Sequence, residues 1–205
     1  MSGDDADAGD AGSDASTGDA GGGTYSLLID LAAPAEIEVG ALGDRTLDAG
    51  VYAYTGSALG AGGFSRVDRH RRTARGEHDV RHWHVDHLLG HPNARIDRVV
   101  RSVGADVECA VADRLPPGPV DGFGASDCGC RSHLAGDADL DRLASLVRDA
   151  HETAIAEYEA ETREAGTREV GTHEDGEQRN GGLRNGERRR VEVTAGSAPD
   201  GSADR

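Results

Sequence analysis

The chain has 205 residues and a formal net charge of −16, and all 22 of its basic residues are arginine. Such an acidic surface is typical of halophilic proteins, which work in very high salt where screening removes self-repulsion, although codon bias would also explain the missing lysine. The sequence has no 18-residue apolar run, so it predicts no membrane span. Its N-terminus lacks a basic region followed by an apolar one, so we predict no signal peptide and a cytoplasmic protein with reduced cysteines.

Residues 1–22 contain six Asp and no basic residue, and most of the others are Gly, Ala and Ser. Such a segment cannot bury enough apolar surface to offset the entropy that ordering would cost. We therefore predict a disordered acidic tail. Residues 23–136 hold six of the seven aromatic residues, and we predict that they form the folded domain, of the α/β class with an α+β arrangement.

The first half of this domain shows the alternation of polar and apolar residues that is typical of half-buried strands. Residues 25–31, 36–39 and 50–54 fit this pattern. Glycines at positions 40 and 43 mark turns after the second of these segments. The sequence thus predicts three strands before residue 60.

The second half of the domain mixes helical and strand patterns. A glycine-rich turn precedes a helix predicted at residues 64–73, and a short second helix follows at residues 83–89. Residues 96–103 are rich in β-branched side chains, which favours a strand. Asp106 is predicted to cap a further helix, which a pair of prolines ends near residue 115.

Apolar residues at intervals of three and four predict an amphipathic helix within residues 137–165. Packing on the domain is the expected role of its apolar stripe, and dimerisation is the alternative. Residues 166–205 are polar, glycine-rich and charged, which predicts a second disordered tail. The stripe consists of Leu140, Leu143, Val147, Ala150, Ala154 and Tyr158.

Charge is distributed unevenly along the chain. Residues 66–101 contain nine Arg and five acidic residues, although the chain as a whole is acidic. A positive patch on an acidic protein is suited to the phosphate backbone of a nucleic acid. The alternative is an arginine-rich helix face that only contacts solvent, and charge alone leaves both interpretations open.

Three short blocks follow one another along the domain: Gly23-Thr24-Tyr25, Tyr54-Thr55-Gly56 and Arg66-Val67-Asp68-Arg69-His70. In this order they resemble the motifs of the GIY-YIG nuclease superfamily. The resemblance covers about residues 23–135 and implies a small domain with a three-stranded, antiparallel-type mixed sheet, plus an extra hairpin in the long interval between the two tyrosines. Further matches indicate the Uri-type branch and a haloarchaeal-like member, and they lie at residues 54–60, 82–89 and 122–134.

The resemblance also implies the residues of an active site. Tyr25 and Tyr54 would lie in one cleft, Arg66 would be the catalytic arginine with His70 on the same helix face, and Glu108 would bind one Mg²⁺ or Mn²⁺. An arginine fork suits phosphoryl oxygens, and a tyrosine acts as a base only if its surroundings favour loss of its proton. Both tyrosine blocks have threonine where the family usually has an aliphatic residue.

The implied activity is that of a metal-dependent endonuclease that hydrolyses phosphodiester bonds in DNA. We expect branched, nicked or single-stranded DNA as the substrate, in repair or recombination, because high salt weakens phosphate contacts relative to shape and stacking. DNA-repair enzymes are the expected protein partners, and no membrane is expected. The alternative is a nucleic-acid-binding module that keeps the fold but has weak or no chemistry. The presence of Tyr25, Arg66 and Glu108 favours the enzyme, and the long interval between the tyrosines and the lack of a match to the family's asparagine keep the alternative open.

A cysteine and histidine cluster offers a second metal site. Cys128, Cys130 and His133, with Cys109 nearby, are the soft ligands that zinc prefers. Their spacing is not that of a common zinc module. A glycine-rich turn with small buried thiols is therefore the favoured interpretation, and zinc is the alternative.

The segment around residue 83 carries further candidates. His84 and His87 are three residues apart on the predicted helix, and the resemblance places them in the cleft, where they would contact phosphate, orient water or carry a proton. Trp83 is predicted to lie in the core, and stacking on an unpaired base is the alternative.

Overall fold

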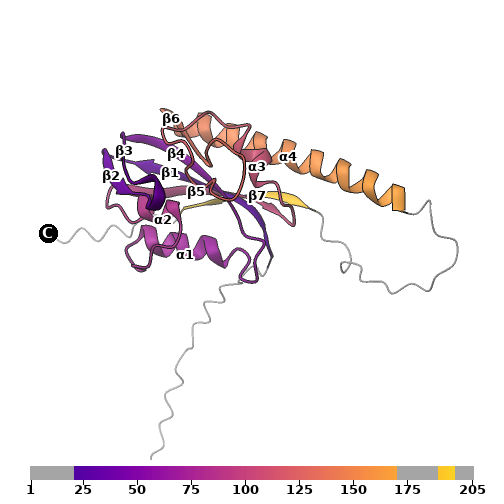
Figure 1. The fold of residues 1–205 in the computed structure, drawn as a ribbon, viewed down its shortest axis with the longest axis horizontal. Helices are drawn as coiled ribbons and strands as arrows, with labels where there is room; N and C mark the ends of the chain where they lie inside the picture. The colour runs from indigo at the N-terminus through magenta and orange to yellow at the C-terminus, as the bar shows by residue number, and fades with distance from the viewer. Residues whose placement is uncertain (1–20, 170–188, 197–205) are drawn as a thin grey trace, which may run out of the picture.

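The computed structural model describes residues 21–169 and 189–196, with the side chains of the long C-terminal helix described to residue 165. Most of the two predicted tails therefore lies outside the described residues. The chain forms one five-stranded sheet with helices on both faces, and a separate two-stranded hairpin (Figure 1). In chain order the elements are β1 (Gly23–Leu31), β2 (Ala35–Glu38), the 3₁₀ turn η1 (Gly40–Leu42), β3 (Asp44–Leu47), β4 (Gly50–Ser57), α1 (Ser65–Ala74), α2 (His84–Leu89), β5 (Ala94–Val103), α3 (Glu108–Ala112), β6 (Leu134–Asp137), α4 (Leu140–Glu169) and β7 (Arg190–Ala195).

The main sheet has the order β6-β4-β1-β5-β7, and all neighbouring strands are antiparallel. The predicted α+β class is confirmed, and the three central strands β4, β1 and β5 were expected. The sheet is wider than the three strands expected, because β6 and β7 extend its two edges. Residues 190–195 fall in the predicted disordered tail, but β7 pairs with β5 and partly buries Val191, so that prediction is wrong for this strand.

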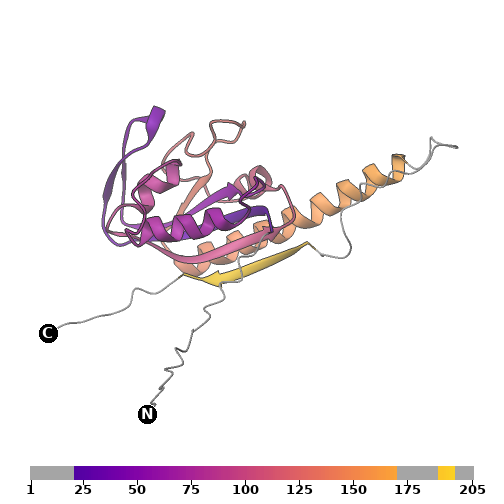
Figure 2. The same cartoon turned by 90° about the horizontal axis from the view of Figure 1, so that it is seen from below.

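The two faces of the sheet carry different helices. Helices α1 and α2 cover one face, and α4 crosses the other (Figures 1 and 2). Alternation along β1 directs Leu27 and Ile29 into the core with α1 and α2, and Leu28 into the core with α4. Leu143 and Val147 of α4 are fully buried beside Leu28, which confirms the packing role of the apolar stripe.

The remaining elements refine the sequence predictions. β2 pairs with β3 and forms the extra hairpin expected between the two tyrosine blocks. α3 begins at Glu108, so Val107 occupies the N-cap position, and Asp106 is not the cap that the sequence predicts. α4 continues to Glu169, past the expected end at residue 165, and its last turns extend beyond the sheet (Figure 1).

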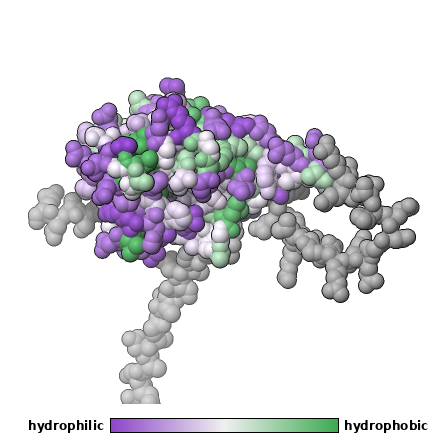
Figure 3. Space-filling view, viewed as in Figure 1, coloured by the Kyte–Doolittle hydropathy of each residue, from purple (hydrophilic) through white to green (hydrophobic). Residues whose placement is uncertain are grey.

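The surface is mainly hydrophilic on the side seen in Figure 3. Among the described residues, none of the helices is both long and apolar enough to cross a bilayer. The large apolar side chains that are exposed in the described part of the chain are Leu59, Val80, Trp83 and Val193.

Candidate functional site

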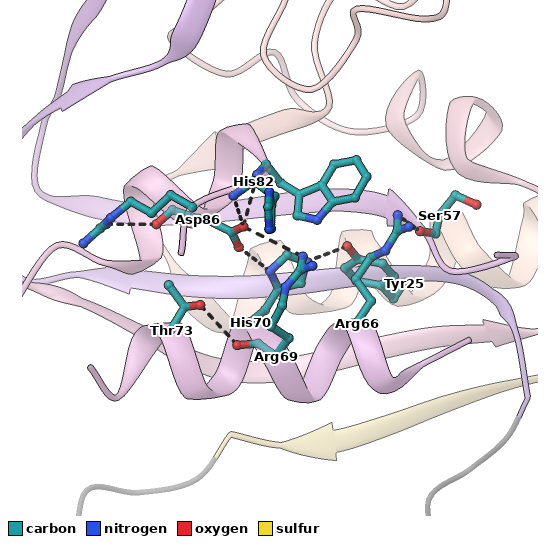
Figure 4. Close-up of polar contacts among 10 residues, drawn as sticks. Tyr25, Ser57, Arg66, Arg69, His70, Thr73, His82 and Asp86 are labelled. Carbon is teal, nitrogen blue, oxygen red and sulfur yellow. Dashed lines mark hydrogen bonds and ion pairs between the residues drawn. The ribbon is translucent and has the colours of Figure 1, made fainter. Parts of the chain in front are cut away.

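A chain of hydrogen bonds runs from β1 through α1 to α2. The Tyr25 hydroxyl lies 2.9 Å from Nε2 of His70, and Nδ1 of His70 lies 2.7 Å from Oδ1 of Asp86 (Figure 4). The second carboxylate oxygen of Asp86 accepts the backbone N–H groups of His82 and Trp83. Three segments of the chain therefore meet in one buried polar row, of which the sequence predicted Tyr25 and His70.

The surroundings of Asp86 and His70 determine which of these two side chains carries a proton. Burial raises the pKa of Asp86, but hydrogen bonds from His70 and from the backbone outweigh burial and hold that pKa below its usual value. Burial lowers the pKa of His70, Asp86 opposes this, and the positive charges of Arg69 and Arg66 add to the lowering, so His70 is neutral at pH 7. Because an ionised carboxylate only accepts hydrogen bonds, the His70 proton lies on Nδ1, and Nε2 accepts the hydroxyl hydrogen of Tyr25.

Tyr25 and Tyr54 lie together, as expected, with ring centroids 6.4 Å apart. Gly56 is the cross-strand neighbour of Tyr25, and a Cβ atom at position 56 would lie 2.8 Å from the Tyr25 hydroxyl. The glycine of the second block is thus required by the ring it faces. Burial raises the pKa of both phenols, the negative charge of Glu108 adds to this, and the positive charge of Arg66 opposes it.

The two threonines that depart from the family pattern are buried and hydrogen-bonded. Thr24 Oγ1 donates to the carbonyl of Ala105 and accepts the backbone N–H of Val107, which fixes the segment that enters α3. Thr55 Oγ1 lies 2.8 Å from Oγ of Ser26, on the face of the sheet opposite to Tyr25. Threonine at position 24 therefore helps to position Glu108, the first residue of α3.

Arg66 lies beside the tyrosines at the start of α1. Its Nη1 donates to the carbonyl of Ser57 at 2.5 Å, and its guanidinium stacks over the ring of Trp83, 4.3 Å from the ring centre. Trp83 is 37% exposed, so the prediction that it lies in the core is wrong. Its ring lies against Arg66, and its backbone N–H donates to Asp86, so Trp83 lies next to the polar row.

A groove of about 360 Å³ opens next to Arg66. The glycine-rich turn at residues 60–63 forms one side, and arginines at intervals of three on α1 form the other. The groove thus brings together three of the nine arginines of residues 66–101. The arginines are Arg66, Arg69 and Arg72.

Glu108 is close enough to both tyrosines to raise their pKa values, and its side chain is 23% exposed. Its Oε1 lies 2.9 Å from Nδ1 of His133. A single partly exposed carboxylate fits Mg²⁺ or Mn²⁺, because these ions keep most of their water ligands and need few protein oxygens. Glu108 thus offers one carboxylate beside the two tyrosines, and its role as a metal ligand stays a prediction.

The predicted cysteine and histidine cluster assembles fully. The ligand atoms of Cys109, Cys128, Cys130 and His133 all lie within 4.8 Å of one another. Cys109 belongs to α3, whereas the other three belong to the loop that leads into β6. Helix α3 therefore supplies Cys109, the fourth potential metal ligand.

The two candidate cleft histidines have different surroundings. Nδ1 of His84 accepts the backbone N–H of Gly124 at 2.8 Å, and its ring packs on Phe123, which itself packs on Tyr54. His84 therefore supports the cleft through a loop. In the described part of the chain, no hydrogen bond joins His87 to either tyrosine. Both histidines are half-buried.

Asp86 is the functional residue that sequence reasoning missed. The sequence predicts neither its burial nor its hydrogen bond to His70. One signal was available, since an acidic residue between Val85 and Leu88 on a short apolar helix has to find a buried partner.

Comparison with known proteins adds one finding. A family model described as "Domain of unknown function DUF123" matches residues 24–156, which span β1 to the middle of α4 and include the whole site. Neither the curated proteins nor the solved structures gave a match. Because the family model covers well over half of the 205 residues, the chain belongs to the DUF123 family.

Proposed function

We propose that the protein is a metal-dependent endonuclease that hydrolyses phosphodiester bonds in DNA, as a member of the Uri-type branch of the GIY-YIG superfamily. The observation that supports this best is the hydrogen-bonded row of Tyr25, His70 and Asp86 beside Arg66 and Glu108. Four separate segments of the chain supply these side chains. A merely structural role would not need a base, a fixed cation and a carboxylate at one place.

The polar row moves a proton away from the attacking water. Burial keeps the Tyr25 phenol from ionising alone, so its proton passes to Nε2 of His70 as Tyr25 takes a proton from the water. The carboxylate of Asp86 stabilises the imidazolium that forms and keeps the ring oriented. The water oxygen bonds to phosphorus, and the bond from phosphorus to the leaving oxygen breaks.

Arg66 and Glu108 act on the phosphate. The guanidinium fork of Arg66 is suited to the charge that grows on the phosphoryl oxygens. Glu108 would hold Mg²⁺ or Mn²⁺, which supplies Lewis-acid stabilisation of the phosphate and of the leaving oxygen when bound. The half-buried position of Arg66, stacked on Trp83, limits its freedom before substrate binds.

The groove at residues 60–63 suits a phosphate backbone, because three arginines and a glycine-rich turn line it. Trp83 offers a partly exposed ring on which an unpaired base can stack. In molar salt, stacking keeps its strength better than phosphate contacts do. Branched, nicked or single-stranded DNA is therefore the proposed substrate, and DNA-repair enzymes are the proposed partners in the cytoplasm.

One observation favours a binding module without chemistry as the second candidate. Tyr25 is 1% exposed and Tyr54 is 6% exposed, so substrate reaches them only if the groups that cover them move aside. A module that binds nucleic acid through the groove alone needs no such movement.

A nuclease assay in molar KCl with Mg²⁺ or Mn²⁺ separates the two candidates. The substrates are duplex, flap, branched and single-stranded DNA, and RNA. We expect cleavage by the native chain and its loss in Arg66→Ala and Glu108→Ala, with DNA binding retained. Arg148→Ala is the matched control, because Arg148 is an exposed arginine of α4 that contacts Ser145, Asp149 and Glu152 on the same helix. Cleavage that survives Arg66→Ala would contradict the assignment, and binding without cleavage by the native chain would favour the module.

A further inference from the structure

The cluster of Cys109, Cys128, Cys130 and His133 lies beside the tyrosine cleft but has no part in the proposed cleavage. We propose that these four side chains bind one zinc ion in a Cys₃His site. Three thiol sulfurs and one imidazole nitrogen are the donor set of structural zinc, and they do not suit Mg²⁺ or Ca²⁺.

The distances fit one ion. Zinc–sulfur bonds of about 2.3 Å and zinc–nitrogen bonds of about 2.0 Å place tetrahedral ligands about 3.5–3.8 Å apart. All four ligand atoms lie within 4.8 Å of one another, and Cys128 Sγ lies 3.4 Å from Nε2 of His133. Side-chain shifts of an ångström or less would complete the tetrahedron.

A second observation points to the same ion independently. Nδ1 of His133 lies 2.9 Å from Oε1 of Glu108, a close polar contact outside the alignment of a hydrogen bond, and the carboxylate favours a proton on this nitrogen. The other nitrogen, Nε2, then faces the sulfur of Cys128 with its lone pair. Histidine ligands of zinc are commonly oriented in this way by a carboxylate on the far ring nitrogen.

The placement of the ligands gives the zinc ion a structural task. Among the described residues, the segment between α3 and β6 is long and contains no helix or strand. It carries Phe123 and Gly124, which pack against Tyr54. A metal that joins α3 to the end of this segment would hold the loop against the cleft. The same ion, through His133, would fix the orientation of Glu108, and this last consequence alone rests on the proposed function.

Metal analysis of the full chain, purified under reducing conditions without added chelator, tests the proposal. We expect one zinc per chain, and after replacement by Co²⁺ we expect the sulfur-to-cobalt charge-transfer band and the visible bands of a tetrahedral thiolate site. Cys109→Ser and Cys130→Ser should each lose stoichiometric zinc. Ser126→Ala is the control, because Ser126 is exposed in the same loop and should keep the metal.

Glu108→Gln guards against variants that fail to fold. It leaves all four ligands in place, and we expect it to bind one zinc with affinity reduced about 10- to 100-fold. Native protein without zinc, Cys109→Ser with unchanged zinc, or thiol titration that finds a disulfide within the cluster under reducing conditions would each overturn the proposal. Zinc bound by a protein that cleaves no DNA would leave the site standing and reject only the proposed function.

Discussion

On each face of the central strand β1, a hydroxyl group contacts a buried histidine, but the two histidines have different second partners. Tyr25 and Ser26 are neighbours on β1 and point to opposite faces, and the hydroxyl of each lies 2.9 Å from Nε2 of a buried histidine. On the face that α1 and α2 cover, Nδ1 of His70 contacts the carboxylate of Asp86. Behind the α4 face, the other nitrogen of His151 meets the hydroxyl of Ser102 at 2.7 Å.

The partner of the second nitrogen decides what each histidine can do. Asp86 offers a negative charge to a protonated His70, so His70 can accept a proton without leaving a buried charge unpaired. Burial lowers the pKa of His151 to about 4, and no neighbouring charge opposes this. His151 therefore stays neutral and joins α4 to β1 and β5. A buried hydrogen-bonded histidine alone does not define a site, whereas one with a carboxylate behind it and a cation nearby can.

Tyr25→Phe is expected to have the largest effect. It removes the hydroxyl that takes the proton and keeps the packing ring, so the cleavage rate should fall about 10²- to 10⁴-fold. Initial rates with the preferred DNA, together with a melting curve, check this. Ser26→Ala removes the matching hydroxyl on the other face and should leave the rate per folded molecule unchanged. Equal rate losses in the two variants would remove the distinction between the faces.

His151→Leu is expected to act on stability alone. It leaves the hydroxyls of Ser26 and Ser102 buried without their ring partner, which should lower the free energy of unfolding by about 4 kcal/mol. Denaturant unfolding in molar KCl measures this loss. Cleavage by the folded fraction should match the native rate. A loss below about 0.5 kcal/mol would mean that the polar link on this face does not stabilise the fold.

Acid should destabilise the protein through the same histidine. The folded-state pKa of His151, about 4, lies below the ordinary value of 6.5, so the unfolded chain binds more protons between these pH values. Its contribution is fully present above pH 6.5, falls as the pH drops toward 4, and amounts to about 3 kcal/mol. Unfolding curves across this range, compared with those of His151→Leu, isolate the effect. A native chain with the same pH slope as the variant would contradict it.

Asp86→Asn should sharpen the comparison, because it makes the partner of His70 resemble the uncharged partner of His151. Without the carboxylate the imidazolium loses its stabilisation, and the rate should fall by about 100-fold, less than after Tyr25→Phe because the Tyr25 hydroxyl remains. Asp86 raises the pKa of His70, so its removal should also shift the acidic limb of the pH–rate profile to lower pH. A rate loss without this shift would indicate that Asp86 only supports the fold.

The sequence predicted the strands of the two tyrosine blocks and the helix of Arg66, because alternation and glycine-rich turns are local signals. It did not predict β7, since six residues with two valines gain their pairing only from β5, far away in the chain. The roles of Asp86 and His151 were missed for a related reason. Their hydrogen bonds depend on how α2 and α4 dock on opposite faces of the sheet, and no local pattern reports that docking.

The smallest predicted effect concerns the stacking of an arginine on an aromatic ring, a contact that occurs on both faces of the sheet. Arg66 stacks on Trp83 behind one face, and Arg189 stacks on Tyr158 behind the other, 4.8 Å from its ring centre. If the groove next to Arg66 binds DNA, Trp83→Ala should weaken binding of single-stranded DNA by about 1 kcal/mol, through the lost stacking surface. Tyr158→Ala removes the corresponding ring from the other face and should leave DNA binding unchanged. Fluorescence anisotropy in molar KCl measures both. A loss in Tyr158→Ala as large as that in Trp83→Ala would place the nucleic acid along α4 instead, and the face of the sheet that carries the polar row would no longer be the binding face.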